Sequence, residues 1–206
     1  MYVKNKMTVN PKTVTLDQTI SEVLDLMHEF KIHRIPVVDK GVLVGLVTQG
    51  VVQENSPSHL TTLSIHEMNY LLSKTKVRDI MIKKVVTVGP EALVEEAADI
   101  MEKKDIGCLP VVGDSNVLLG IMTTSDILKA FVDLFGYNQQ GSRVTFLVND
   151  QVGAFAAFTK LFADNGISIS HFTNQGNEVM IRCNELDKKR VRELLEKNGY
   201  TITSIL

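Results

Sequence analysis

The chain has no tryptophan, only two cysteines among 206 residues, and a net charge of −2. Cys108 and Cys183 stand alone, without a C-x-x-C pair or a histidine at ligand spacing, so the sequence predicts no metal site. The near-zero charge gives no general attraction to nucleic acid or to an anionic membrane. No apolar run reaches the length of a membrane span, and the first residues lack the apolar core of a signal peptide. These absences predict a reduced, cytoplasmic protein that binds neither nucleic acid nor membrane.

Catalytic arrangements are missing as well. The sequence contains no Ser/His/Asp, Cys/His, zinc or phosphate-loop set at a spacing that such chemistry needs. It therefore predicts no catalytic residues, no required cofactor and a protein that is not an enzyme.

What is present, instead, is an internal repeat over the first two thirds of the chain. The same offset of 74 residues separates Met27 from Met101 and Pro36 from Pro110. Each copy reads as a short strand, an amphipathic helix, two apolar strands and a second helix. The expected short strands are 13–15 and 85–88, and the expected apolar strands are 35–38, 42–47, 109–112 and 117–122. A single copy is too small to bury a good core, so the two are expected to pack together as one domain.

The stretch from Gly120 to Asp126 marks a strand that becomes a helix. A helix N-terminus presents unpaired N–H groups and the positive end of a dipole, which suits an anion. Thr123 and Asp126 add a hydroxyl and a carboxylate that can hold a sugar hydroxyl. The alternative interpretation is a simple helix cap, because Ser and Asp are common at helix starts.

The last third has a different pattern. Strands at 143–148, 167–173, 178–183 and 200–205 alternate with helices at 154–165 and 186–198. This βαββαβ order is the split βαβ, or ferredoxin-like, pattern. The sequence thus predicts five segments: a first repeat over 1–60, a helical connector over 61–76, a second repeat over 77–136, a linker over 137–142 and a final domain over 143–206.

Three segments carry a resemblance to known families, which are Lys31–Asp39, Val77–Met81 and Gly120–Asp126. Through them, residues 1 to about 136 resemble a tandem pair of cystathionine-β-synthase (CBS) domains. Through its βαββαβ pattern and the loop from Asn149 to Gly153, the final domain resembles an ACT domain. Together with the connector from Leu63 to Met81, the combination is similar to the bacterial acetoin-utilisation protein B (AcuB-like) family. The implied fold class is α+β, with two β-α-β-β-α repeats forming one module, followed by a βαββαβ ACT domain.

The CBS resemblance implies a site for an adenosine-containing nucleotide between the repeats. Its sugar half would be Ile121, Thr123, Ser125 and Asp126. Its phosphate half would be His33 and Arg34 in the I-H-R-x-P motif that ends at Pro36, and its adenine would lie near Pro11 and Lys12. In the mirror-related site, Val51 stands where the carboxylate should be, and Gly107 and Cys108 replace the basic pair, so one site per chain is expected.

The resemblance also implies a role. The chain would be a regulatory protein that binds AMP, ADP or ATP and relays occupancy by rearranging modules or a homodimer formed through the CBS and ACT parts. A cyclic dinucleotide or S-adenosylmethionine remains an alternative ligand, and a ligand-free assembly scaffold an alternative role. An effector loop in the ACT-like part would consist of Asn149, Asp150 and Gly153, although Val152 replaces the family's proline. The protein partner and the pathway stay open.

Overall fold

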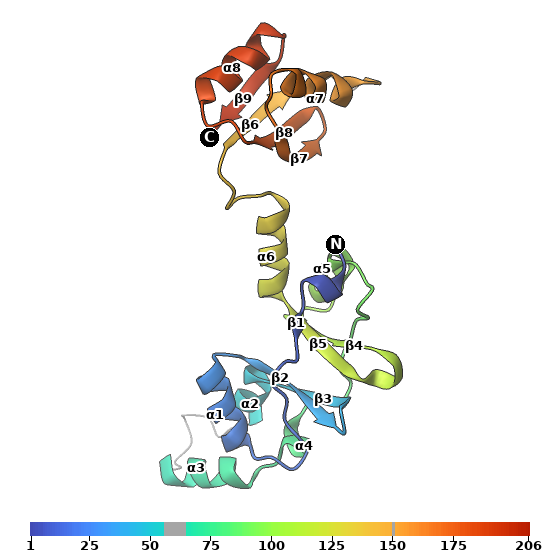
Figure 1. Ribbon diagram of the computed structural model, residues 1–206. Coiled ribbons are helices and arrows are strands. Elements are labelled where there is room, and N and C mark those ends of the chain that lie inside the picture. The colour runs from blue at the N-terminus through green and yellow to red at the C-terminus, as the bar shows by residue number, and fades with distance from the viewer. Residues whose placement is uncertain (56–64, 150) are drawn as a thin grey trace. The chain divides into compact units, whose positions relative to one another are not determined.

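A computed structural model describes residues 1–55, 65–149 and 151–206 of the chain. The described residues form two compact units, Met1–Ile127 and Leu128–Leu206. Helix α6 (Thr124–Leu134) begins in the first unit and ends in the second (Figure 1).

The first repeat is a helix packed on a hairpin. Helix α1 (Ile20–Phe30) starts at a capping box, in which Thr19 and Glu22 bond each other's backbone N–H groups. Strands β2 (Arg34–Asp39) and β3 (Val42–Thr48) pair antiparallel and lead into helix α2 (Gln49–Asn55). Lys40 and Gly41 both have positive φ, as the tight turn of a two-residue hairpin requires. The repeat is held by a cluster of Val14, Ile20, Val23, Met27, Ile35, Val37, Val47, Val52 and Val77.

The second repeat reproduces this arrangement. Helix α5 (Val94–Lys103) buries Val94, Ala97 and Met101. Strand β4 (Cys108–Val112) pairs antiparallel with β5 (Leu118–Thr123), which runs directly into α6. Gly45 and Gly120 are 75 residues apart rather than 74, so the second copy has one extra residue between its two strands, where a short 3-10 helix, Asp114–Asn116, makes the turn. The expected first helix of each copy and the four apolar strands are therefore present. No strand end differs from its expected position by more than one residue.

The leading segment of each repeat pairs with the other repeat. After the 3-10 helix Val3–Asn5, strand β1 (Thr8–Val9) pairs with β5 of the second repeat. In the same way Ile82 exchanges two backbone hydrogen bonds with Leu46 of the first repeat, at 2.9 and 3.0 Å. Helices α3 (Ile65–Lys74) and α4 (Val77–Ile80) connect the copies. Ser64 directly precedes α3 and is of a residue type that suits a helix cap, but it lies outside the described residues.

Two glycines make these crossings possible. A Cβ on Gly120 would lie 2.8 Å from the backbone oxygen of Thr8. A Cβ on Gly45, its counterpart, would lie 3.1 Å from the backbone oxygen of Ile82. A larger residue at Gly120 would push Thr8 off its strand, whereas at Gly45 Ile82 would have to move by a few tenths of an ångström, so the need for glycine is strongest at Gly120.

The short strands expected at 13–15 and 85–88 are corrected to single bridges. Val14 forms a parallel bridge with Val37 only, and Val88 with Val111 only. Val14 donates to Pro36 O and accepts from Val38 N, and the chain then turns toward the cap of α1. The turn leaves no room for a longer ladder.

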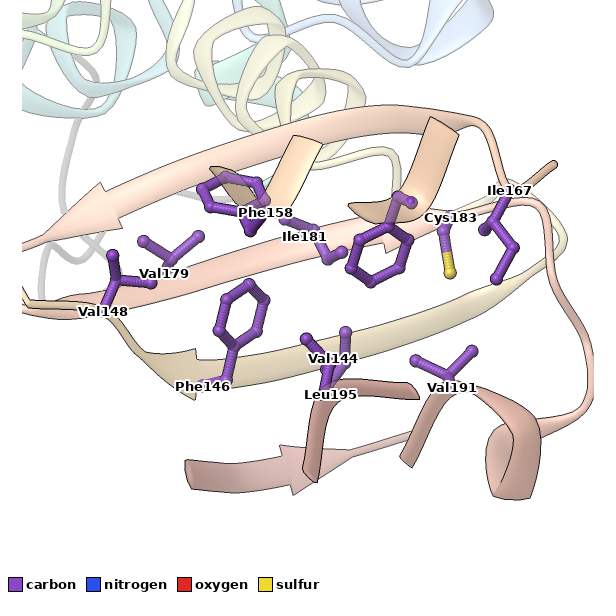
Figure 2. Packing of buried hydrophobic residues seen from close by; sticks show 11 residues of the cluster. Val144, Phe146, Val148, Phe158, Ile167, Val179, Ile181, Cys183, Val191 and Leu195 are labelled. Carbon is purple, nitrogen blue, oxygen red and sulfur yellow. The ribbon is translucent and has the colours of Figure 1, made fainter. Parts of the chain in front are cut away.

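The second unit holds a four-stranded antiparallel sheet in the order β7-β8-β6-β9. Its elements follow as β6 (Ser142–Leu147), α7 (Ala154–Asp164), β7 (Ile169–Gln175), β8 (Glu178–Cys183), α8 (Lys188–Lys197) and β9 (Thr201–Ile205). This is the βαββαβ order expected from the sequence, with α8 shortened at its start because Asp187 caps it. Side chains of β6, β8, α7 and α8 meet in one core cluster (Figure 2). The cluster lies on one face of the sheet, because neighbouring side chains of a strand point to opposite faces.

Candidate functional site

The junction of β5 and α6 carries a reciprocal hydrogen-bonded pair. Oδ2 of Asp126 accepts from the backbone N–H of Thr123 at 2.9 Å and from its hydroxyl at 2.6 Å. The hydroxyl oxygen in turn accepts from the Asp126 N–H at 3.4 Å. Asp126 is only 8% exposed. Within the described part of the chain, its second oxygen, Oδ1, has no hydrogen-bond partner, so the carboxylate can cap the helix and still accept a further bond.

The equivalent junction of β3 and α2 has only half of this pair. The Val51 N–H donates to the Thr48 hydroxyl at 3.2 Å, but Val51 has no carboxylate to return the bond. The two junctions thus share their backbone geometry and differ in one acidic group. The alignment of the two repeats within the sequence predicted this difference.

Arg34 stands between the repeats. It opens β2 opposite Thr48. Its side chain reaches the second repeat, where a Cβ built on Gly107 would lie 3.0 Å from Arg34 Cζ. The same Cβ would be 3.3 Å from the hydroxyl of Thr124, which donates to Gly107 O at 3.1 Å. One guanidinium therefore lies near both strand-to-helix junctions.

A cavity of about 590 Å³ opens beside Arg34. Its basic wall consists of His33, Arg34 and Lys84. This volume falls in the usual range for small-molecule sites. The remaining lining residues are Leu46, Thr48, Gln49, Gly50, Gln53, Ile82, Val85, Val86, Asp105, Ile106, Gly107 and Cys108.

The structure thus places the expected site residues in three groups. His33 and Arg34 line the cavity, next to the Thr48 junction. Thr123 and Asp126 form the other junction, where Ser125 is exposed, and neither Thr123 nor Asp126 lines the cavity. Ile121 pairs with Thr8, just ahead of Pro11 and Lys12. The structure therefore places the basic pair at the Thr48 junction, and Arg34 also approaches the second junction at Thr124.

Two further expected residues have contacts of their own. Pro36 is buried in β2, with its carbonyl bonded to Val14 N–H. Lys12 holds its ammonium 3.9 Å above the centroid of the Phe30 ring. Neither residue lines the cavity.

The sequence reasoning missed the other basic and backbone groups of this cavity. Lys84, Val85 and Val86 come from the leading segment of the second repeat, ahead of α5. The signal was available, because the 74-residue offset that relates the copies carries Pro11 and Lys12 onto Val85 and Val86.

Cys108 lines the same cavity as a neutral thiol. Burial raises the pKa of Cys108 from 9.0 to about 11, and the positive charge of Arg34 offsets part of that rise. A thiol in this state is a poor nucleophile, so the residue serves as a small apolar wall.

In the second unit, part of the expected effector loop borders a smaller cavity. Asn149 and Gly153 line about 270 Å³ of space at the start of α7, together with Gln151, Asn174 and Gly176. Asp150, the third expected residue, lies outside the described residues.

The described residues contain neither a candidate metal cluster nor a helix that could span a membrane. Among residues 1–55, 65–149 and 151–206, no cluster of three His, Cys, Asp or Glu side chains is placed to hold a metal ion. Over the same ranges, every helix is too short or too polar to span a bilayer.

Comparison with known families matches the two repeats. The CBS domain model matches residues 3–52 and 77–133, just over half of the chain. The chain therefore belongs to the CBS domain family and carries the domain in tandem.

Relatives share this region. An uncharacterized protein of Methanocaldococcus jannaschii, MJ1426, is 34% identical over 155 residues, which cover 64% of this chain and 92% of that protein. Inosine-5'-monophosphate dehydrogenase of the same organism is 33% identical over 131 residues, which cover 63% of this chain but only 22% of the enzyme. The similarity to the dehydrogenase is thus partial.

Solved structures agree on the fold of the pair. A proposed acetoin utilization protein (AcuB) from Vibrio cholerae is 30% identical, with a TM-score of 0.56 over 68% of this chain and 98% of that one. CBSX2 in complex with AMP is 28% identical, with a TM-score of 0.53 over 64% and 96%. The CBS pair of MJ0100, in complex with 5'-methylthioadenosine and S-adenosyl-L-methionine, is 26% identical, with a TM-score of 0.52 over 64% and 99%. Similar CBS pairs therefore bind adenosine-containing ligands.

Proposed function

We propose that this chain is a non-enzymatic regulatory protein that binds an adenosine-containing nucleotide between its CBS repeats. The observation that carries the proposal is the Asp126 carboxylate, which is nine-tenths buried and keeps one oxygen free while the other caps α6. A ribose diol supplies the two hydroxyl donors that such a group and Thr123 can bind. The complexes of CBSX2 and MJ0100 support the choice of ligand class.

The phosphate end of the ligand would meet Arg34 and His33. A guanidinium can fork to two phosphate oxygens, and Lys84 adds a third positive group to the same wall. These groups favour AMP, ADP or ATP over S-adenosylmethionine or a neutral nucleoside. A cyclic dinucleotide, which also carries phosphate, remains an alternative within this class.

We further propose one strong site per chain. The junction at Thr48 has no carboxylate, because Val51 takes the place that Asp126 has in the second repeat. A ribose at Thr48 would lose its charged acceptor, which costs more than an ordinary hydrogen bond.

Calorimetric titration of the full chain with AMP, ADP, ATP and S-adenosylmethionine tests these points. Asp126→Asn keeps the shape of the side chain and should weaken nucleotide binding about tenfold or more. Glu22→Gln is the matched control, since Glu22 forms the same kind of capping box at α1, in the first repeat and away from the junction of β5 and α6. Equal affinities for Asp126→Asn and the unaltered chain would contradict the sugar-binding role. No heat with any nucleotide would favour the ligand-free scaffold.

The proposed readout of binding is a rearrangement of modules or of a homodimer. A ligand shifts such an equilibrium only by its different affinity for the two states. We propose that the second unit is an ACT-like domain that relays this change or adds an amino-acid signal through the loop at Asn149 and Gly153. Small-angle scattering with and without saturating nucleotide measures the change, and an unaltered profile would argue against it.

We also propose a cellular location and a pathway for this regulatory role. The similarity to AcuB suggests a cytoplasmic sensor of the cell's energy state that acts on an unidentified partner in acetoin utilisation. Activity assays of the partner with and without AMP and ATP would test this setting once that partner has been isolated by co-purification.

A further inference from the structure

A row of basic side chains crosses the sheet of the second unit. In the strand register, Arg182 of β8 lies opposite His171 of β7 on one side and opposite Arg143 of β6 on the other. All three stand on the face away from the core cluster, since their neighbours Val144, Ile181 and Phe172 point into it. We call this the open face. Like charges directly opposite in a sheet destabilise it, so the row needs an explanation.

The guanidinium of Arg182, in the centre of the row, is buried and has an N–H group without a hydrogen-bond partner. Arg182 is 8% exposed, and its Nη1 donates to Gln139 O at 3.0 Å. Its Nε is buried without any partner. Buried charges are normally paired, because an unpaired one has lost its hydration without compensation.

No acid of the described chain neutralises the row. Within residues 1–55, 65–149 and 151–206, neither Arg143 nor Arg182 forms an ion pair. Glu178 is on the same face of β8, four residues from Arg182, but its carboxylate accepts from the Thr203 hydroxyl at 2.7 Å. The backbone of Arg143 exchanges two hydrogen bonds with Leu206. These bonds do not involve the guanidinium of Arg143.

Both arginines line a cavity with an apolar far wall. The cavity has a volume of about 230 Å³, and none of its lining residues is acidic. The end of α6 and the following turn supply the other wall, in which the rings of Phe131 and Phe135 are 4.6 Å apart. Figure 1 shows how the chain leaves α6 and enters β6. The wall residues are Phe131, Val132, Phe135 and Tyr137.

We propose that this cavity binds a small monocarboxylic acid with an apolar or aromatic body. The carboxylate would lie against Arg143 and Arg182, whose planar forks match its two oxygens. The body would lie against the phenyl rings and Val132, as in most small-molecule sites. An inorganic anion would leave the apolar wall in water. The α-ammonium of an amino acid would be repelled by the two guanidinium groups and would find no acidic side chain in the lining, so acids without it are preferred.

Phenylacetate is the probe, and titration calorimetry and thermal unfolding of the full chain are the measurements. Phenylacetate should bind one-to-one and raise the unfolding temperature. Acetate, inorganic phosphate and L-phenylalanine should each bind at least about tenfold more weakly than phenylacetate. Acetate and phosphate lack the apolar body, and L-phenylalanine adds a positive charge that the arginines repel. Absence of phenylacetate binding, or equal binding of phosphate or L-phenylalanine, would overturn the proposal.

Variants assign the binding to the arginines. Arg143→Gln and Arg182→Gln should each weaken phenylacetate binding about tenfold or more. Arg192→Gln is the matched control, because this arginine is exposed on α8 and pairs with Glu196. Circular dichroism checks folding. If Arg182→Gln does not fold, Arg143→Gln decides, and unchanged binding in it would overturn the proposal. The nucleotide site contains neither arginine, so the two proposals fail independently.

Discussion

The guanidinium of Arg34 lies against the backbone of Gly107, at the position where the second repeat has its counterpart of His33. A side chain at position 107 and the guanidinium of Arg34 compete for the same space. The two repeats thus cannot both carry the basic pair in this arrangement. The absence of a basic pair at Gly107 and Cys108 is therefore what leaves space for the guanidinium of Arg34.

Gly107→Ala tests this relationship. The new methyl group would displace the guanidinium, which is the far end of a flexible side chain, so stability should fall by less than about 1 kcal/mol. Nucleotide affinity should fall about tenfold, because Arg34 is moved from its place. Gly89→Ala is the control, since a Cβ there meets nothing within 4 Å. Calorimetry and urea denaturation measure both quantities, and unchanged affinity would contradict a phosphate role for Arg34 in its present position.

Val51→Asp should restore the second sugar site. The Val51 N–H already bonds to the Thr48 hydroxyl, so an aspartate there can complete the pair that Thr123 and Asp126 form. The expected result is a rise in nucleotide stoichiometry from one to two per chain. Asn55→Asp adds the same charge at the exposed end of α2, four residues further on and outside the cavity lining, and should leave the stoichiometry at one. A stoichiometry of two before any substitution would refute the one-site proposal.

Gly120→Ala should weaken the first unit. Its Cβ would lie 2.8 Å from the Thr8 backbone oxygen, which cannot move without separating β1 from β5. We expect a loss of about 1–3 kcal/mol in the free energy of unfolding. Gly50→Ala, in α2 with nothing nearer than 3.8 Å, should be neutral or slightly stabilising. Urea denaturation compares the two variants, and equal stabilities would show that the crossing strand tolerates displacement.

Alkaline pH should destabilise the fold through Cys108. The folded-state pKa is raised from 9.0 to about 11, so the neutral thiol stabilises the folded state below pH 9. That contribution is lost as the pH rises from 9 toward 11, by about 2 kcal/mol in all. Cys108→Ala should therefore show a shallower decline of stability over this range than the unaltered chain. Burial also raises the pKa of Cys183, which keeps some slope in the variant. Parallel declines would mean that the Cys108 thiol ionises as easily in the folded state as in the unfolded one.

The sequence predicted most of the elements because their signals are local. Short runs of apolar residues marked β2, β3, β4 and β5, and the change from strand to helix marked the junction at Asp126. The single bridges at Val14 and Val88 were expected to be longer, because the early turn toward each helix has no strong sequence signal.

The missed features depend on pairings between distant segments. Lys84 reaches the cavity because Ile82 pairs with Leu46 of the other repeat, and a periodicity argument does not include that pairing. Arg143, Arg182 and His171 become neighbours through the register of three strands. A shift of one residue in any strand would move its basic group to the other face, so the sequence alone did not reveal the row.

The exchange of leading segments means that neither repeat is an independent folding unit. A chain cut between the repeats would leave each half without the segment that closes its sheet, namely β1 for one and the stretch at Ile82 for the other. The two halves, produced separately, should be unstable alone and reassemble when mixed, as complementing fragments do. We therefore expect the two repeats to fold and unfold together, because each one completes the sheet of the other.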